Sequence, residues 1–311
     1  MNTTTTSRRG ILCLCAVLLF RLFVHAHAAD STPPLNAAAA KGDLASVKEF
    51  VKQGTDLNSS VVDGWTPLLL SVREGHTPIV EYLLSSGADG RAHTTNGNSA
   101  LHVAVDRGHL DVINVLIKNR LPVNEKNPKG VSPLLMAAAQ RKLAAAKLLV
   151  EAGADVNASG PTNDVNTILN VLMVAAWTGD TNLVGFLLDH EADPNLKTPQ
   201  GNTAFLQTAK YPHAAVLKLL LQRGAKIDLQ DDSGYTALIF AAYNGRADNV
   251  RILIEAGADL DAAVVAGAPY GRSRIGGDFA YDAEIYARQQ GHPGVADIIS
   301  AARSQSKRHS P

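Results

Sequence analysis

The sequence is poor in cysteine and in aromatic residues, and it carries no net charge. Its two cysteines, Cys13 and Cys15, both lie near the start of the 311-residue chain. The remainder can therefore form no disulfide, thiolate metal site or redox-active thiol of its own. Aromatic residues make up 5% of the chain, and 29 basic residues balance 29 acidic ones. This balance provides no overall attraction to nucleic acid or to an anionic membrane surface.

The sequence also lacks an apolar run long enough to span a membrane near its start. The run from Ile11 to Phe20 is half the length that a spanning helix needs. It follows Arg8 and Arg9 and precedes the small-x-small sequence Ala26-His27-Ala28, an order typical of a secretory signal peptide. We therefore expect residues 1–28 to be removed and residues 29–34 to be a linker. The mature chain is then periplasmic or secreted, without membrane contact, and both Sec and twin-arginine export stay open.

One unit recurs along most of the chain and is clearest in Asp232–Asp261. Thr236 is suited to cap a first helix, and Gly245 ends that helix. Asn249 to Glu255 predict a second helix with one apolar face. Gly257 supplies the left-handed residue that ends the second helix. The unit is therefore a pair of helices joined by a short turn.

The unit repeats with a period of 33 residues, interrupted by one spacing of 38. A hydroxyl or amide side chain that can cap a helix precedes each first helix. Two helices and a turn at this period indicate a repeat array. The predicted first helices begin at Pro67, Ala100, Pro133, Val171, Ala204 and Ala237.

Three short motifs resemble those of the ankyrin repeat family: TPL at Thr66, SALHVA at Ser99 and GADVN at Gly153. The resemblance implies an all-α ankyrin-repeat solenoid, in which β-turn hairpins join helix–turn–helix repeats. We expect six full repeats plus N- and C-terminal caps over residues 35–301, and a disordered tail over residues 302–311. The expected segments are a cap at 35–60, repeats at 61–93, 94–126, 127–159, 160–197, 198–230 and 231–262, and a cap at 278–301.

Two insertions interrupt this pattern. Five extra residues fall within Ser159–Asn166, which we expect to form a longer surface loop. Ala263 to Gly277 is rich in glycine and predicts a second, longer loop before the final cap. This second loop contains Tyr270, Arg272 and Arg274, but no base or nucleophile is paired with them. We therefore expect no enzymatic activity from the loop.

Residues suited to catalysis or metal binding are scattered along the array. His76, His109 and His292 recur at equivalent turns, too far apart to share a metal, so we expect structural roles for them. In the ankyrin family, the histidine that corresponds to His102 bridges neighbouring repeats. The acidic cluster around Asp228 lacks the spacing of a calcium loop. We expect no catalytic residues, no metal site and no cofactor.

Partners of ankyrin proteins usually lie on a concave face that the hairpin tips and first helices build. Trp, Tyr and Arg are enriched in binding hot spots, so we expect residues of these types at the equivalent positions to contact a partner. The alternative that some of the aromatic residues only pack between repeats stays open. The predicted partner-binding residues are Trp65, Arg73, Arg107, Arg141, Trp177, Tyr211, Tyr235 and Tyr243.

The resemblance implies a non-enzymatic protein–protein interaction module that binds another protein and not nucleic acid. Exported bacterial proteins of this kind resemble accessory proteins that partner or protect another exported protein. One such role is that of an accessory to a periplasmic stress-defence enzyme, for example a catalase. Two alternatives stay open: an immunity protein against a secreted toxin, and a host-directed secreted effector.

Overall fold

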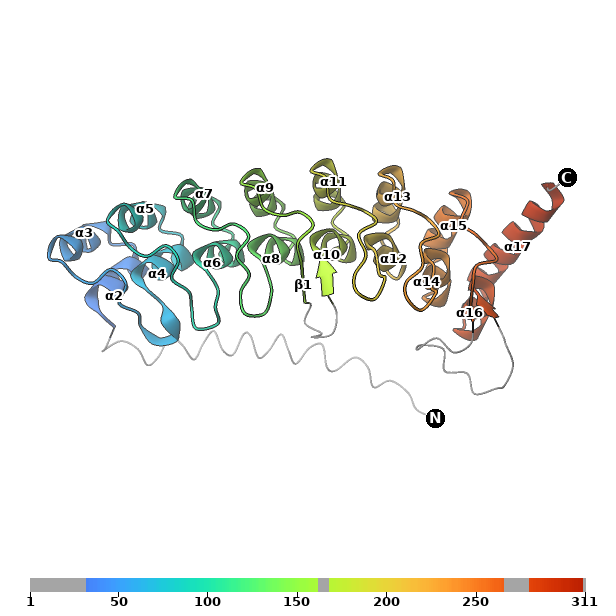
Figure 1. Ribbon diagram of the computed structural model, residues 1–311, viewed down its shortest axis with the longest axis horizontal. Coiled ribbons are helices and arrows are strands. Elements are labelled where there is room, and N and C mark those ends of the chain that lie inside the picture. The colour runs from blue at the N-terminus through green and yellow to red at the C-terminus, as the bar shows by residue number, and fades with distance from the viewer. Residues whose placement is uncertain (1–31, 162–167, 266–279, 310–311) are drawn as a thin grey trace, which may run out of the picture. The chain divides into compact units, whose positions relative to one another are not determined.

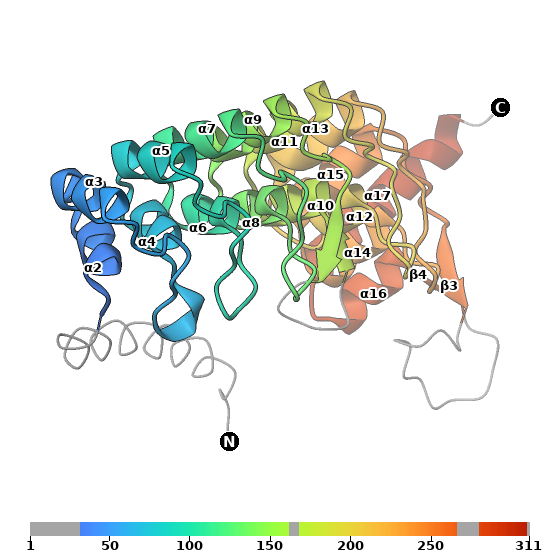
Figure 2. The same cartoon turned by 60° about the vertical axis from the view of Figure 1, so that its left-hand side comes forward.

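A computed structural model describes residues 32–161, 168–265 and 280–309. The chain divides into two compact units, one up to Thr95 and one from Asn96 onward. Figures 1 and 2 show the helices that make up each unit. The expected signal peptide lies outside the described residues, and so does the segment with Tyr270, Arg272 and Arg274. Within the described ranges, no helix has both the length and the apolar character that membrane crossing requires.

The first unit contains two helix pairs. The pairs are α2 (Pro34–Lys41) with α3 (Leu44–Lys52) and α4 (Pro67–Glu74) with α5 (Thr77–Ser85). The short 3-10 helix η1 (Val62–Gly64) lies in the turn before α4. The helix α2 packs against α4, and α3 packs against α5, so the two pairs stack in the same orientation.

The second unit repeats the same pairing (Figure 1). Each first helix packs against the next first helix, and each second helix against the next second helix, which produces two parallel rows. The first-helix row consists of α6 (Ala100–Arg107), α8 (Pro133–Ala139), α10 (Val171–Thr178), α12 (Ala204–Ala209), α14 (Ala237–Tyr243) and α16 (Ala283–Gln289). The second-helix row consists of α7 (Leu110–Lys118), α9 (Leu143–Glu151), α11 (Thr181–Asp189), α13 (Ala214–Gln222), α15 (Ala247–Glu255) and α17 (Pro293–His309).

Small residues in the first helices lie at the contacts between repeats. The doublets Ala137-Ala138, Ala175-Ala176 and Ala241-Ala242 are all fully buried. Their small side chains let neighbouring helices approach closely. Apolar residues of the second helices complete the core, because Leu149, Leu187 and their equivalents are also fully buried. The apolar core therefore runs through the successive repeats of the unit.

Side-chain oxygens cap the first helices as predicted. In five of these helices the residue before the helix accepts a hydrogen bond from the backbone N–H three positions later, at 2.8–3.3 Å. These bonds satisfy N–H groups that the helix itself cannot pair. The capping residues are Thr66, Ser132, Asn170, Thr203 and Thr236.

Most helix ends use glycine in the left-handed conformation, but three such positions hold another residue. Arg120 and Glu191 stand where other repeats end the second helix with glycine, and their φ angles are 59° and 66°. Arg141 takes the same conformation in the turn between α8 and α9, with φ of 57°. A side chain in this region costs about 1 kcal/mol or more relative to glycine. The repeats that contain Arg120 and Glu191 therefore end under local strain.

Side chains reach from one repeat to the end of the preceding first helix. His76 Nε2 lies 3.0 Å from the carbonyl oxygen of Ala40 in the first unit. In the second unit, His213 Nε2 lies 3.1 Å from the Trp177 carbonyl oxygen. Two cationic side chains occupy the equivalent place in other repeats, because Lys142 donates to Val105 and Asp106, and Arg246 donates to Lys210. The structural role predicted for His76 is thus confirmed, and lysine or arginine can also fill it.

His102 bridges two repeats, as the family resemblance implies. Its side chain is fully buried, and Nε2 lies 2.8 Å from the carbonyl oxygen of Val131 in the next hairpin. The other ring nitrogen, Nδ1, lies 2.8 Å from Ser99 Oγ at the start of the same helix. The imidazole therefore joins the cap of α6 to the hairpin that follows.

A ladder of side-chain acceptors links the turns after the second helices. Asn124, Asn157 and Asn195 each accept the backbone N–H of a residue one repeat later, at 2.8–3.0 Å. Asp228 takes the same position and accepts from the N–H of Asp259 at 3.0 Å. The structure thus gives Asp228 a structural role in the ladder.

Both insertions contain short antiparallel strand pairs, where the sequence predicts only loops. Strand β1 (Ser159–Pro161) pairs with β2 (Ile168–Asn170), and β3 (Ala263–Val265) pairs with β4 (Ala280–Asp282). Gly160 in β1 cannot be replaced without movement, because a Cβ atom there would lie 2.6 Å from the Gly130 carbonyl oxygen. The strands fix where each insertion leaves and rejoins the array.

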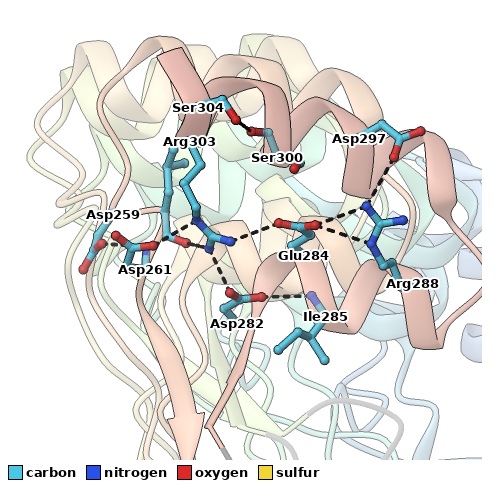
Figure 3. A network of polar contacts seen from close by, with 11 residues as sticks. Asp259, Asp261, Asp282, Glu284, Ile285, Arg288, Asp297, Ser300, Arg303 and Ser304 are labelled. Atoms are coloured by element: carbon cyan, nitrogen blue, oxygen red, sulfur yellow. Dashed lines mark hydrogen bonds and ion pairs between the residues drawn. The ribbon is translucent and has the colours of Figure 1, made fainter. Parts of the chain in front are cut away.

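Helix α17 continues to His309, so the expectation of a disordered tail from residue 302 is wrong for residues 302–309. Arg303 explains the difference, since its guanidinium pairs with Asp261, Asp282 and Glu284 at 2.8–3.0 Å (Figure 3). Burial lowers the pKa of Arg303, but the hydrogen bond that Arg303 donates to Asp282 and the nearby carboxylates outweigh it and raise this pKa overall. The side chain is 19% exposed. The ion pairs hold α17 against β4 and α16.

Candidate protein-binding face

Equivalent positions of successive first helices line up along one side of the row. Because α10, α12, α14 and α16 pack in sequence, a residue at a given place in one helix lies beside its equivalent in the next. Three such places carry most of the aromatic residues in this part of the row: two residues before the helix start, and the fourth and seventh positions. We call these positions in the last four repeats the candidate face. They hold Leu169, Val174, Trp177, Asn202, Gln207, Lys210, Tyr235, Phe240, Tyr243, Tyr281, Tyr286 and Gln289.

Five aromatic rings form a connected cluster at the C-terminal end of this face. Tyr286 is its centre, with ring centroids 5.6 Å from Tyr235, 5.9 Å from Tyr243 and 5.7 Å from Tyr281. Phe240 stacks on Tyr235 with centroids 5.1 Å apart. Ring pairs at these distances stabilise beyond the area that they bury. We call these five residues the aromatic cluster.

The hydroxyl groups of Tyr235 and Tyr286 are paired inside the cluster. Their oxygens lie 3.0 Å apart, and the two side chains are 5% and 6% exposed. Burial is the main cause that raises the pKa of Tyr286, and the hydrogen bond with Tyr235 adds to it. Tyr286 therefore stays neutral at a pH where an exposed tyrosine ionises.

Lys210 lies over the cluster from the preceding repeat. Its Nζ is 4.1 Å from the centroid of the Phe240 ring, which is a cation–π contact, and 3.3 Å from Asn202 Oδ1. Burial lowers the pKa of Lys210, while the charge of Asp231 acts in the opposite direction. The ammonium group thus covers the Phe240 side of the aromatic cluster and leaves the Tyr243 side open.

The structure separates the predicted aromatic residues into exposed and buried ones. Trp177 and Tyr243 are 42% and 40% exposed, so both can touch a partner. Tyr211 is half-buried and stacks on His213 with centroids 6.1 Å apart. Tyr235 is 5% exposed, so its predicted place at a contact surface is wrong. Its ring fills the space between Phe240 and Tyr286, which is the packing role that the sequence left open.

The predicted arginines lie in two different settings. Arg107 and Arg141 are exposed in the second unit, and the Arg107 Nε is 3.8 Å from Asp106 Oδ2. In the first unit, the Arg73 guanidinium lies over the Trp65 ring at 4.8 Å and its Nε is 2.7 Å from Glu74. Trp65 and Arg73 are half-buried. They contact each other and so offer less free surface than Arg107 and Arg141.

Sequence reasoning missed Phe240, Tyr281 and Tyr286. Tyr281 lies two residues before its helix, as the predicted Trp65 and Tyr235 do, whereas Phe240 and Tyr286 lie at the fourth helix position, where no contact residue was predicted. The signal was present, because Tyr286 is the fourth residue of α16 as Phe240 is of α14. The long insertion before α16 displaces this repeat from the 33-residue period and hides the equivalence.

The described part of the chain offers no group of three or more His, Cys, Asp or Glu side chains placed to hold a metal ion. One hollow of about 470 Å³ lies against Asp189, His190 and Glu191 at the turn after α11. Its wall is partly charged and the hollow is open to solvent, unlike the enclosed apolar pockets that bind small molecules. The exposed aromatic surface is therefore the stronger candidate for a functional site.

Comparisons with known proteins agree with this architecture. The structure resembles the ankyrin repeat domain of human ASB11, with a TM-score of 0.62 and 22% identity over 73% of this chain and 99% of that one. It also resembles the ankyrin repeat domain of Bcl-3, described as a unique member of the IkappaB protein family. The TM-score is 0.65, with 24% identity over 73% of this chain and 99% of that one. At these identities the likeness shows the fold alone.

A search of curated proteins finds no match. The family model for ankyrin repeats, which spans three copies, matches residues 8–94, 87–160 and 172–263. The first of these matches begins inside the segment expected to be a signal peptide. Since the matches together cover well over half of the sequence, the chain belongs to the ankyrin repeat family.

Proposed function

We propose that this chain is a non-enzymatic protein-binding module whose partner lies on the candidate face. Ankyrin repeats generally mediate protein–protein interaction. The observation that carries the proposal is the exposure of Trp177 and Tyr243, at 42% and 40%, at equivalent positions two repeats apart. Trp and Tyr are also the residues most often found as binding hot spots.

The packing around these residues suits them to recognition. Tyr243 rests edge-on against Tyr286, whose own ring is buried, so its orientation is set before a partner arrives. A side chain that is already ordered loses less conformational entropy on binding. Truncation of each anchor is expected to cost about 2 kcal/mol of binding free energy. Micromolar affinity corresponds to about 8 kcal/mol, so two or three such anchors supply much of it.

We also propose that the module acts outside the cytoplasm, in a periplasm or beyond it. The order of basic, apolar and small residues in the first 28 positions supports this proposal. A role as accessory to another exported protein, such as a stress-defence enzyme, fits a binding module of this kind. Fractionation of cells that express the full chain checks the location. Protein found only with the cytoplasmic fraction, at full length, would contradict it.

The binding proposal is tested by capture of a partner. The tagged protein and the Trp177→Ala/Tyr243→Ala double variant are incubated with cell-envelope extract, and the retained proteins are identified by mass spectrometry. Binding of the identified partner is then measured with both purified proteins. Phe186→Ala is the matched control, because it removes a half-buried aromatic side chain from α11 in the second-helix row.

We expect the double variant to lose the partner and the Phe186→Ala control to keep it. Both variants must unfold at nearly the same temperature as the parent protein, since Trp177 and Tyr243 lie partly in solvent. Retention of the same partner by the double variant at unchanged affinity would show that the candidate face is not the contact surface.

A further inference from the structure

An exposed Asn-Gly pair stands in the turn that leads into α6. Asn96 lies in this turn with its side chain in solvent, and the described residues offer that side chain no hydrogen-bond partner. Gly97 follows it with φ of 70°. The peptide nitrogen of a following glycine can reach an asparagine side chain more easily than that of any other residue, because glycine carries no side chain to hinder the approach.

Four described turns of the second unit have glycine at this place, but only one has asparagine before it. The residues before the four glycines are Asn96, Lys129, Gln200 and Ser233. Lysine and serine have no side-chain carbonyl. The carbonyl of glutamine lies one bond farther from the main chain, so an attack on it would close a six-membered ring. Among these four residues, only Asn96 can close a five-membered ring with the nitrogen of the next residue.

Packing against the next repeat keeps glycine at position 97. A Cβ atom on Gly97 would lie 2.1 Å from Pro128 Cδ and 2.4 Å from Pro128 Cγ. The left-handed φ of Gly97 also disfavours any residue with a side chain. The fold therefore requires, directly after Asn96, the one residue that leaves Asn96 open to attack.

The other Asn-Gly pair of the chain, Asn244-Gly245, is held by its surroundings. Asn244 Nδ2 donates to the Phe240 carbonyl oxygen at 2.8 Å, and this contact is part-buried. The N–H of Gly245 donates to the Ala242 carbonyl oxygen at 3.1 Å. Both bonds must break before the Gly245 nitrogen can reach Asn244 Cγ. The structure thus separates two pairs that are identical in sequence.

We propose that Asn96 is a site of spontaneous deamidation, which gives the turn before α6 a negative charge. The Gly97 nitrogen attacks Asn96 Cγ and loses its proton to water. The new N–Cγ bond forms as the Cγ–Nδ2 bond breaks, and ammonia leaves. Water then opens the resulting succinimide, at Cγ to give aspartate or at the main-chain carbonyl to give isoaspartate. Water is the only reactant besides the chain itself, and nothing is oxidised or reduced.

The isoaspartyl product changes the main chain as well as the charge. The main chain then runs through the former side chain and is one carbon atom longer between positions 96 and 97. Gly97 lies against Pro128, and Ser99 Oγ pairs with His102 Nδ1 at 2.8 Å at the start of α6. The extra atom displaces this cap relative to Pro128. Isoaspartate at position 96 should therefore loosen the first turn of α6, while aspartate should not.

The test follows the full-length protein during incubation at neutral and at mildly alkaline pH. Peptide mapping with electron-transfer fragmentation measures aspartate and isoaspartate separately at positions 96 and 244. The synthetic peptide TTNGNSA, which corresponds to residues 94–100, gives the rate without the fold. The deamidated protein is separated by ion exchange, and its hydrogen exchange in α6 is measured. Asn96→Gln, incubated in the same way, is the matched variant, because Gln200 precedes glycine in an equivalent turn.

We expect Asn96 to deamidate about tenfold faster than Asn244, because the Asn244 side chain must first leave its hydrogen bond. The rate at Asn96 should rise with pH, since the attacking nitrogen must lose a proton. In the isoaspartyl form, amides of the first turn of α6 should exchange about tenfold faster, and incubated Asn96→Gln should keep its protection there. Equal rates at the two pairs would overturn the inference, and so would an Asn96 that stays intact while the free peptide is converted. The inference does not depend on partner binding, so either result leaves the function proposed above standing.

Discussion

Replacement of Arg303 by alanine should loosen the C-terminal end of the array without unfolding the rest. The guanidinium group pairs with Asp282 at 2.8 Å and Glu284 at 3.0 Å, and these three side chains are each about 20% exposed. It also donates to the Leu260 carbonyl oxygen and pairs with Asp261, whose side chain is 77% exposed (Figure 3). Removal of the cation leaves carboxylates close together on β4 and α16 with less charge to balance them.

The size of the effect follows from the exposure of each pair. A hydrogen bond to a charged group contributes about 1.5–3 kcal/mol when it is well shielded. An exposed pair such as that with Asp261 contributes about 0.5 kcal/mol. The bonds share one side chain and are not additive, so we expect a loss of about 2–3 kcal/mol. Because a repeat array is stabilised mainly by neighbouring contacts, this loss should fall on α16 and α17.

Hydrogen exchange read by mass spectrometry measures this loss locally. A change of 2–3 kcal/mol corresponds to about a 30- to 150-fold increase in the opening equilibrium of the amides in α16 and in the first turns of α17. Amides of α6 to α9 should keep their protection. Arg303→Lys should be intermediate, because lysine keeps the charge but cannot form the same forked contacts. Arg308→Ala, on the exposed end of the same helix, is the control and should leave protection in α16 unchanged. Wild-type exchange in Arg303→Ala would show that α17 is held by apolar packing alone and that the ion pairs add nothing.

Three further predictions concern single side chains. His102→Ala should lower the free energy of unfolding by about 2–3 kcal/mol in a urea titration, because it removes a fully buried side chain and leaves the part-buried Val131 carbonyl without its 2.8 Å partner; an unchanged midpoint would contradict the bridging role. Glu191→Gly should raise the free energy of unfolding by about 0.5–1 kcal/mol, since it relieves a φ of 66° while adding freedom to the unfolded chain; a lower urea midpoint would show that the strain is not stored there. The raised pKa of Tyr286 means that the folded state holds its proton where the unfolded state loses it. Its stability contribution is therefore present below about pH 10 and lost as the pH rises through the higher folded value. Tyr286→Phe should remove from an ultraviolet absorbance titration a phenol that ionises above the ordinary tyrosine pKa, and a titration that still showed this step would refute the assignment.

The periodic features of this fold can be predicted from sequence because each depends on local chemistry. The cap at Thr236 involves an N–H only three residues away, and the ends of second helices need a left-handed residue at one fixed place. Where Arg120 and Glu191 replace glycine, the backbone still takes the left-handed conformation. The repeat context therefore determines the backbone at these points, and the local residue preference yields to it.

The aromatic cluster could not be predicted in the same way because it depends on contacts across an insertion. Tyr286 lies 51 residues after Tyr235, and their hydroxyl contact sets which neighbouring rings are covered. Tyr235 and Tyr243 are similar residues on the same repeat, yet one is 5% and the other 40% exposed. The difference in exposure between the two tyrosines depends on where α16 packs. The choice of Trp177 and Tyr243 as contact residues therefore stays a prediction until a partner is bound.

The C-terminal helix shows the same limit of sequence reasoning. Residues 302–309 are polar and basic, which is typical of a disordered end, but α17 extends through them. The partners of Arg303 lie 21 and 19 residues earlier, at Asp282 and Glu284. No local pattern connects these positions. Their proximity follows from the hairpin of β3 and β4 and the antiparallel packing of α16 on α17.

Some contacts run from a side chain in one repeat back to the first helix of the preceding repeat, so the two ends of the array are not equivalent. The carbonyl groups at the end of α10 and α12 receive their partners from His213 and Arg246, which are synthesised 36 residues later. As the chain leaves the ribosome from its N-terminus, the helix pairs that begin with α10 and α12 therefore stay incomplete until their successors have emerged. A fragment that stops after α11 or α13 would keep those carbonyls open to water at its last helix pair. A shortened version of this protein should accordingly be made by deleting internal repeats, so that the final pair α16 and α17 is kept.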